Sequence, residues 1–287
     1  MAGVSTAACQ SPISRLQCGT IGKAVVLILT EPTMDMATDR SATGIVTAAI
    51  LVIGDEILSG RTKDKNIGYI AEYLTNIGVD LREVRVVPDI EEEIVAAVNA
   101  LRARYTHVFT TGGIGPTHDD ITADSIAKAF GVPIDVDERA VKLLLERIPQ
   151  KDLNEARLRM ARIPQGADLI ENSVSKAPGF SLSNVHVMAG VPAIMQAMLD
   201  ALAPRLQTGT KMLSRSIPAK AKEGDVATPL AEVQKRFPDI IMGSYPSYAD
   251  GIPTTTLVLR SRDEARLVEA EAAVEAMLAE IWARVAS

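Results

Sequence analysis

A glycine-rich segment in the middle of the chain carries the clearest chemical signal. It spans Thr111–Asp120, reads TGGIGPTHDD and follows a short apolar run. Glycines let a ligand approach the backbone closely, and the start of a following helix offers unpaired N–H groups to a phosphate. Adjacent carboxylates would repel that phosphate unless a divalent cation lay between them. The segment therefore predicts a metal–phosphate site.

Acidic residues also follow two other predicted strands. Asp55 and Glu56 come directly after the apolar run 48–53, and Asp89 follows the segment 79–87. Open α/β sheets bind ligands beyond the carboxyl ends of their strands, where these turns would meet the glycine segment. Mg²⁺ is usually held by one or two carboxylates together with substrate phosphates. We expect a metal held by Asp55, Glu56 and Asp120, with Mg²⁺ or another divalent cation as the cofactor.

Each of these acidic residues also has a purely structural explanation. Asp89 precedes Ile90-Glu91-Glu92, a pattern typical of a helix N-cap. Asp119 or Asp120 could likewise cap the helix after the glycine segment. The glycines alone could form an ordinary turn, and a single glycine-rich loop is weak evidence. The convergence of three turns on one sheet edge favours a functional site.

Histidine is rare, and one of three such residues lies inside the glycine segment. His118 could donate to a phosphate or transfer a proton, because an unperturbed imidazole titrates near neutral pH. It could equally shape an exposed turn. His107 and His186 lie in strand-like segments and are expected to be structural.

Composition excludes several classes of protein. The chain has 287 residues, a formal charge of −6 and 3% aromatic residues, so neither a basic face nor stacking platforms for nucleic acid are expected. Both cysteines, Cys9 and Cys18, lie near the start, which leaves the body without a disulfide framework or a cysteine nucleophile. The apolar run 24–29 is too short to span a membrane. We expect a cytoplasmic protein that binds neither membrane nor nucleic acid.

The hydrophobic pattern divides the chain into three parts. Residues 1–43 show no sustained period and are expected to form a disordered or extended tail, with Met34 and Met36 as alternative starts. Residues 44–208 alternate apolar runs at 48–53, 79–87, 106–111, 168–171 and 185–188 with helical spacing at 67–77, 90–101, 137–148, 153–162 and 192–206. This order predicts an α/β fold with a mostly parallel sheet and helices on both faces.

Residues 209–287 have a different pattern. Strand-like runs at 212–217, 240–244 and 254–259 alternate with helical spacing at 225–236 and 263–285. The order β-α-β-β-α predicts a small ferredoxin-like α+β domain.

Four motifs resemble one known family. The segment Thr110–Thr122 is similar to the signature of the MoaB/MogA molybdopterin-binding fold, and its double Asp resembles the CinA-like subgroup. Ile53–Gly60, Ala177–Phe180 and Gly190–Pro192 resemble further motifs of that subgroup. His118 and the segment Gly243–Pro246 resemble the molybdopterin-binding-like domain of FAD synthases. The resemblance covers about residues 46–262.

The resemblance implies a three-layer αβα domain in a homo-oligomer with a small-molecule nucleotide or pterin phosphate ligand. It implies catalytic roles for Asp89 and Asp120, to which the loop adds Asp119, and dependence on a divalent ion or on K⁺. The expected ligand contacts are Thr111, Gly112, Gly113, Gly115, Thr117, His118, Lys176 and Gly190. The chain departs from the family pattern at Ser175-Lys176 and at Ala189, and neither deamidation nor FAD synthesis is expected of it.

Three functions are compatible with these observations. The first is metal-dependent hydrolysis of nucleotide pyrophosphates such as ADP-ribose or FAD. The second is molybdopterin binding, adenylylation or molybdate insertion in molybdenum cofactor biosynthesis. The third is a non-catalytic nucleotide-binding module.

Overall fold

A computed structural model describes residues 44–249 and 252–285. The predicted tail, residues 1–43, lies outside these ranges, as do Cys9 and Cys18. No helix within the described ranges is long and apolar enough to cross a membrane.

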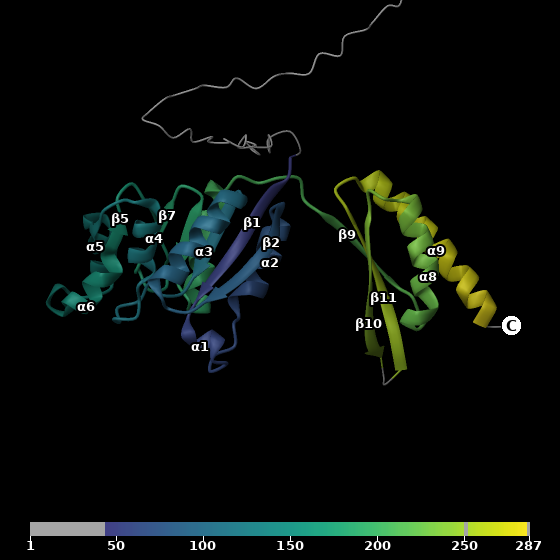
Figure 1. Cartoon of the computed structure of the whole chain (residues 1–287), viewed down its shortest axis with the longest axis horizontal. Coiled ribbons are helices and arrows are strands. Elements are labelled where there is room, and N and C mark those ends of the chain that lie inside the picture. The colour runs from purple at the N-terminus through teal and green to yellow at the C-terminus, as the bar shows by residue number, and fades with distance from the viewer. Residues whose placement is uncertain (1–43, 250–251, 286–287) are drawn as a thin grey trace, which may run out of the picture. The chain divides into compact units, whose positions relative to one another are not determined.

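A six-stranded sheet forms the centre of the N-terminal region (Figure 1). Its strands are β1 (Val46–Ile53), β2 (Val79–Val87), β3 (His107–Thr111), β6 (Asp168–Ile170), β7 (Gly179–Leu182) and β8 (Val185–Met188). They lie in the order β2-β1-β3-β8-β7-β6, and β1–β2, β1–β3 and β3–β8 are parallel pairs. β7 runs in the opposite direction and pairs antiparallel with β6 and β8. The prediction of a mostly parallel sheet is confirmed.

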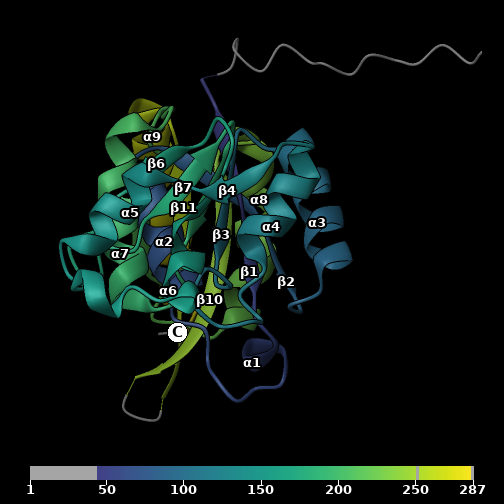
Figure 2. The same ribbon diagram turned by 90° about the vertical axis from the view of Figure 1, so that its left-hand side faces the viewer.

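Helices cover both faces of this sheet and make it a three-layer αβα structure. α2 (Asn66–Asn76) and α7 (Pro192–Leu202) lie on one face, and α3 (Glu91–Arg104) and α4 (Thr122–Phe130) lie on the other (Figure 2). α5 (Glu138–Leu145) contributes Ala140 and Leu144 to the same core as α3 and α4. Successive residues of β1 serve the two layers: Ile50 packs with Ile70 and Leu199, whereas Leu51 packs with Ile94. A strand covered on both faces must be apolar throughout, which explains the continuous run 48–53.

Short elements account for most differences from the sequence prediction. They are α1 (Asp55–Leu58), α6 (Glu155–Leu158), the 3₁₀ turns Gln150–Asp152, Arg159–Ala161 and Ala203–Arg205, and the antiparallel pair β4 (Ile134–Val136) and β5 (Arg162–Pro164). The single helix predicted over 153–162 is wrong, because Arg162 already pairs with Val136 in the small sheet. The helix predicted over 137–148 ends at Leu145. β7 was not predicted. It joins β8 through a tight turn in which Ser183 has a φ of +55°.

The C-terminal region forms a small α+β unit, as predicted. β9 (Leu213–Pro218), α8 (Glu223–Arg236), β10 (Ile241–Ala249), β11 (Ile252–Ser261) and α9 (Glu264–Val285) follow one another, and the antiparallel sheet has the order β10-β11-β9. The two helices share one core with β9 and β11, through Val226, Val274 and Leu257 among others. β10 and β11 extend beyond the predicted runs as a long hairpin. Pro246 is tolerated there because β10 is an edge strand.

Candidate functional site

The parallel strands β1, β2 and β3 end at the same edge of the sheet, and their turns are linked there. The N–H of Gly54 donates to the carbonyl of Val87 at 3.2 Å, and the N–H of Gly112 donates to the carbonyl of Met188 at 3.2 Å. Gly112 has a φ of +105°, and a Cβ at this position would lie 2.1 Å from the carbonyl oxygen of Ile53. Only glycine permits this close approach of β1 and β3. The predicted convergence of the three turns is therefore observed.

The glycine loop, residues 112–120, is closed by the first residue of α4. The Thr122 hydroxyl donates to the Gly112 carbonyl at 3.0 Å, and the Thr122 N–H donates to the Gly113 carbonyl at 3.0 Å. Gly113 has a φ of +64°, and a Cβ there would lie 2.2 Å from the Thr122 hydroxyl oxygen. A Cβ on Gly115 would lie 2.6 Å from the Asp120 carboxylate. The glycines thus keep the loop tight and bring its backbone beside Asp120.

Asp120 stabilises the loop itself and does not cap α4. Its Oδ2 accepts hydrogen bonds from the Thr117 N–H at 2.8 Å and from the Thr117 hydroxyl at 2.5 Å. The N-cap of α4 is Ile121, without a side-chain cap, so the capping interpretation is wrong for Asp119 and Asp120. The Thr117 side chain lowers the pKa of Asp119, which stays exposed and charged.

Asp89 links the second turn to the first. Its Oδ2 accepts a hydrogen bond from the Asp55 N–H at 2.9 Å, whereas Ile90 is the N-cap of α3 and has no side-chain cap. Burial raises the pKa of Asp89, and the charges of Asp55, Glu56 and Asp119 raise it further, although the bond from Asp55 opposes this. The helix-cap interpretation of Asp89 is therefore wrong for α3. Asp89 fixes the start of α1 and with it the position of Glu56.

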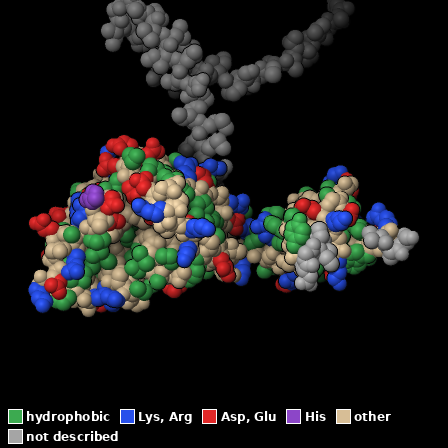
Figure 3. Space-filling view, turned by 90° about the horizontal axis from the view of Figure 1, so that it is seen from below, with side chains coloured by type: hydrophobic (Ala, Val, Ile, Leu, Met, Phe, Trp, Pro, Cys, Tyr) green, Lys and Arg blue, Asp and Glu red, His purple; other side chains and the backbone are tan. Residues whose placement is uncertain are grey.

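A cleft of about 530 Å³ lies at this edge. Its lining residues are Glu56, Thr62, Gly112, Gly113, Ile114, Gly115, Pro116, Asp120, Met160, Ser175, Ala177, Ala189, Gly190, Val191, Pro192, Ile194 and Met198. Six of the predicted site residues are among them: Glu56, Gly112, Gly113, Gly115, Asp120 and Gly190. The lining therefore combines backbone and carboxylates with aliphatic side chains. Figure 3 faces this edge and shows acidic side chains gathered beside a hollow that is bordered by hydrophobic surface.

The other predicted residues lie outside the set that lines the cleft. Lys176 forms an ion pair with Glu146 at 2.6 Å, so Ser175 and Ala177 border the cleft in its place. The side chain of His118 is fully exposed, and its Nδ1 lies 3.9 Å from Asp119. Thr111 lines a neighbouring recess. The remaining residues, Asp55, Asp89, Thr117 and Asp119, lie in the turns around the cleft.

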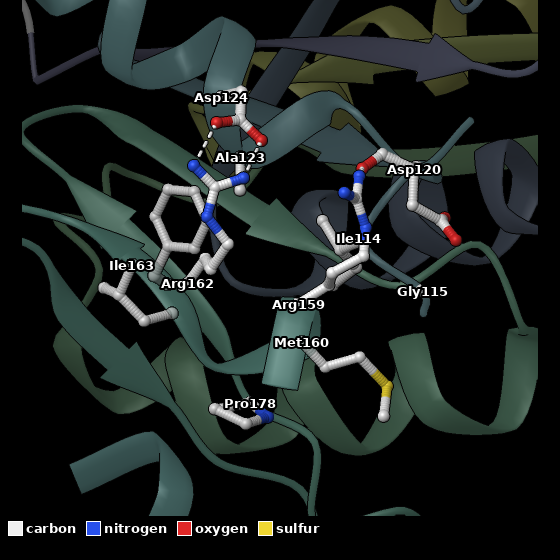
Figure 4. A pocket seen from close by; sticks show the side chains of 12 residues that line it. Ile114, Gly115, Asp120, Ala123, Asp124, Arg159, Met160, Arg162, Ile163 and Pro178 are labelled. Carbon is white, nitrogen blue, oxygen red and sulfur yellow. Dashed lines mark hydrogen bonds and ion pairs between the residues drawn. The ribbon is translucent and has the colours of Figure 1, made fainter. Parts of the chain in front are cut away.

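Three residues near the site were missed in the sequence analysis. Arg159 donates from Nη2 to the carbonyl oxygen of Asp120 at 3.1 Å, and Figure 4 shows its side chain extended toward that residue. In the same hollow Arg162 pairs with Asp124 at 2.7 Å, and Met160 borders both this hollow and the cleft. These residues are about forty positions from the loop along the chain, so no local sequence pattern could predict their place beside it.

The carboxylates fit a metal that is shared with phosphates better than a metal held by protein alone. Within 44–249 and 252–285, no group of three or more His, Cys, Asp or Glu side chains is arranged to hold a metal ion. The predicted trio of Asp55, Glu56 and Asp120 is thus not assembled as a set, because Asp55 begins α1 and does not line the cleft that Glu56 and Asp120 share. Mg²⁺ bound to a nucleotide is usually held by one or two carboxylates together with the phosphates, and Glu56 and Asp120 in the lining of the cleft fit that pattern.

Comparisons with known proteins agree with this architecture. Residues 49–208 match the family model described as "Probable molybdopterin binding domain", and residues 211–285 match that of "FAD synthase, middle domain". The chain belongs to the family of molybdopterin-binding-fold proteins and to its CinA-like branch.

Individual relatives support the same assignment. A protein of Thermococcus kodakarensis is 36% identical over 236 residues, which cover 77% of this chain and 92% of the relative. A protein of Pyrobaculum calidifontis is 35% identical, covering 70% and 80%. The crystal structure of CinA, of unknown function, from Thermoplasma acidophilum is 35% identical with a TM-score of 0.54 and covers 57% of this chain and 99% of that one.

Proposed function

We propose that the protein is a metal-dependent hydrolase of nucleotide pyrophosphates such as ADP-ribose or FAD. The observation that carries this proposal is the mixed lining of the cleft. Backbone of the glycine loop, Glu56 and Asp120 supply its polar part, and aliphatic side chains such as Met160 and Met198 supply its apolar part. A nucleotide pyrophosphate has the same two parts, with a charged diphosphate joined through a ribose to a flat aromatic base.

The residues divide the chemical work as follows. Backbone N–H groups between Gly113 and Gly115 bind the diphosphate and stabilise charge that develops on phosphorus. Glu56 and Asp120 would hold a Mg²⁺ ion, which would supply Lewis-acid polarisation of the phosphoryl oxygens. Asp89 is a positioning residue, because its bond to Asp55 sets the start of α1. Arg159 holds the backbone of Asp120 and adds positive charge beside the loop.

The reaction breaks one bond of the pyrophosphate bridge. The oxygen of a water molecule attacks one phosphorus, the bridging P–O bond breaks, and two phosphate monoesters leave with the protons of water. ADP-ribose would yield AMP and ribose 5-phosphate. Association into a homo-oligomer and a cytoplasmic location remain predictions.

The test is an assay of ADP-ribose and FAD hydrolysis with Mg²⁺, Mn²⁺ or Co²⁺, in which the two monoesters are separated and quantified. We expect metal-dependent turnover that Asp120→Asn lowers by about two orders of magnitude, as for loss of one electrostatic contact in a desolvated site. Asp152→Asn, an exposed carboxylate in a 3₁₀ turn, is the matched control. Absence of turnover by the wild type, or an Asp120→Asn variant as active as the control, would reject the proposal.

A second candidate is molybdopterin binding or transfer in cofactor assembly. It is favoured by the family model that matches residues 49–208, and it would use the same cleft. Complementation of a strain defective in molybdenum enzymes would select it. Nucleotide binding without consumption in a calorimeter would instead select a non-catalytic module.

A further inference from the structure

A second hollow opens beside the cleft, on the side of the sheet that α2 covers. This side recess has a volume of about 210 Å³. It shares Glu56, Thr62, Gly112, Gly190 and Pro192 with the cleft, so the two hollows have a common wall. A ligand whose diphosphate lies on the glycine loop would therefore have one arm in the cleft and a second arm directed at the side recess.

Asn66 lies at the start of α2 in the wall of the side recess and is 4% exposed. The Asp64 carboxylate accepts the N–H groups of Asn66 at 3.0 Å and Ile67 at 2.8 Å, which fixes this turn. The Asn66 Nδ2 donates to the carbonyl oxygen of Gly190 at 2.8 Å, and this bond fixes the orientation of the amide. The Asn66 Oδ1 is then a buried acceptor without a partner among the described residues.

Thr111, the last residue of β3, provides a second unused polar group. It is 1% exposed, lines the side recess, and its hydroxyl has no hydrogen-bond partner among the described residues. Leaving a buried polar group unpaired costs free energy, so two such groups in one small hollow indicate a missing partner. The Asn66 carbonyl accepts only, whereas the Thr111 hydroxyl both donates and accepts. A ligand hydroxyl can donate to the Asn66 carbonyl and can either donate to or accept from the Thr111 hydroxyl, so one hydroxyl or a pair of them would satisfy both groups.

We propose that the side recess binds the hydroxyl groups of a sugar or sugar alcohol attached to the diphosphate. This inference rests on the proposed function and assigns Asn66 and Thr111 to the recognition of the second, polyhydroxyl half of such a substrate. The Asn66 Oδ1 accepts a hydrogen bond from one hydroxyl, and the Thr111 hydroxyl pairs with a neighbouring one. The glycine loop holds the diphosphate, and the aliphatic side chains that line the cleft hold the base.

The experiment measures what the second sugar adds to binding. Methylene-bridged analogues of ADP and ADP-ribose, which cannot be hydrolysed at the bridge, are titrated into the full chain with Mg²⁺ in a calorimeter. We expect the ribose-bearing analogue to bind about tenfold more tightly, the equivalent of one or two net hydrogen bonds. In Thr111→Val and Asn66→Leu this preference should shrink toward onefold, while affinity for the ADP analogue changes less.

Controls separate binding from folding. Asn76→Leu removes an exposed amide at the other end of α2 and should keep the preference. Thr111→Val deletes a hydroxyl that makes no internal bond, so it should fold even if Asn66→Leu does not. Equal affinity of the wild type for the two analogues would overturn the inference. A preference that Thr111→Val preserves would also overturn it, and would indicate that an ordered water is the partner of these two groups. If neither analogue binds, the proposed function fails and the inference with it.

Discussion

The two ends of the central sheet differ in whether their buried polar groups have hydrogen-bond partners. Near the amino ends of β3 and β8, the His107 Nδ1 lies 3.1 Å from the His186 Nε2, and the His186 Nδ1 lies 2.9 Å from the Ser181 hydroxyl. The His107 Nε2 lies 3.0 Å from the carbonyl of Gln207. One placement of the protons satisfies all three hydrogen bonds of this series. The Ser181 hydroxyl donates to His186, His186 donates to His107, and His107 donates to the carbonyl of Gln207.

Near the carboxyl ends, several buried polar groups have no hydrogen-bond partner within 44–249 and 252–285. The hydroxyls of Thr110 and Thr111 and the Oδ1 of Asn66 are buried without partners in the described part of the chain. Because each unpaired group costs stability, the two that line the side recess, Thr111 and Asn66, fit the proposed role in ligand binding. The comparison suggests a division in which the amino end holds the fold and, under the proposed function, the carboxyl end gives up stability for binding.

The largest effect on stability is expected from Gly112→Ala, because Gly112 lies directly at the carboxyl end of β3. The added Cβ would lie 2.1 Å from the carbonyl oxygen of Ile53, at a φ of +105°. Backbone must shift, and we expect a loss of at least about 3 kcal/mol in the free energy of unfolding, measured with urea. Gly131→Ala is the matched control: its φ is +66°, but the Cβ would meet nothing within 4 Å, so about 1 kcal/mol is expected. Equal losses would show that close packing at Gly112 is unimportant.

The histidine chain should make the amino end sensitive to acid. Burial, followed by the charges of His107 and Arg205, lowers the pKa of His186 to about 3, and burial lowers the pKa of His107. A lowered histidine pKa means that the unfolded chain binds the proton more readily, so stability falls as pH drops below about 6.5 toward 3. Between pH 6.5 and 5, His186 alone should remove about 2 kcal/mol.

Urea unfolding at both pH values, on the wild type and on His186→Gln, isolates this contribution. The variant should start from lower stability at pH 6.5 and lose less on acidification to pH 5. A wild type and a variant with the same pH dependence would show that His186 is not held neutral.

Two substitutions, one at each end of the sheet, should change the free energy of unfolding by similar amounts but in opposite directions. Thr111→Val replaces an unpaired hydroxyl with a methyl group and should leave stability unchanged or raise it by up to about 1 kcal/mol. Ser181→Ala removes the partner of the His186 Nδ1 and should cost about 1 to 2 kcal/mol. Thermal denaturation of both variants without ligand gives the answer. Destabilisation by both would mean that Thr111 has an internal role.

The smallest effect is expected from His118→Ala. This side chain is fully exposed in the glycine loop, so its removal should change the free energy of unfolding by less than about 0.5 kcal/mol. Urea unfolding beside His186→Gln makes the contrast between an exposed and a buried histidine explicit. A loss above 1 kcal/mol would indicate that His118 is packed.

The sequence predicted what periodicity and turn chemistry encode. The apolar run of β1, the helices that follow it and the convergence of three turns all arise from local pattern and from the direction of parallel strands. The strand β2 was predicted with its observed limits, Val79–Val87. Contacts between distant segments were not predictable in this way. Arg159 reaches Asp120 across 39 positions, and Asn66 reaches Gly190 across 124.

Side-chain direction explains the remaining differences within the candidate site. The resemblance predicted ligand contacts for Lys176 and His118, and the structure shows Lys176 paired with Glu146 and His118 exposed to solvent. Asp89 looked like the cap of α3, yet it accepts a bond from the Asp55 N–H in the neighbouring turn. Spacing along the chain fixes which turn a side chain occupies, whereas its partner depends on the packing of the turn beside it.

The most direct test of the central claim is a crystal structure of the chain with Mg²⁺ and methylene-bridged ADP-ribose. The account predicts the diphosphate against the backbone of Gly113–Gly115, the metal between it and the carboxylates of Glu56 and Asp120, and the second ribose beside Asn66 and Thr111. A ligand bound away from the carboxyl edge of the sheet, or no bound ligand at saturating concentration, would contradict it.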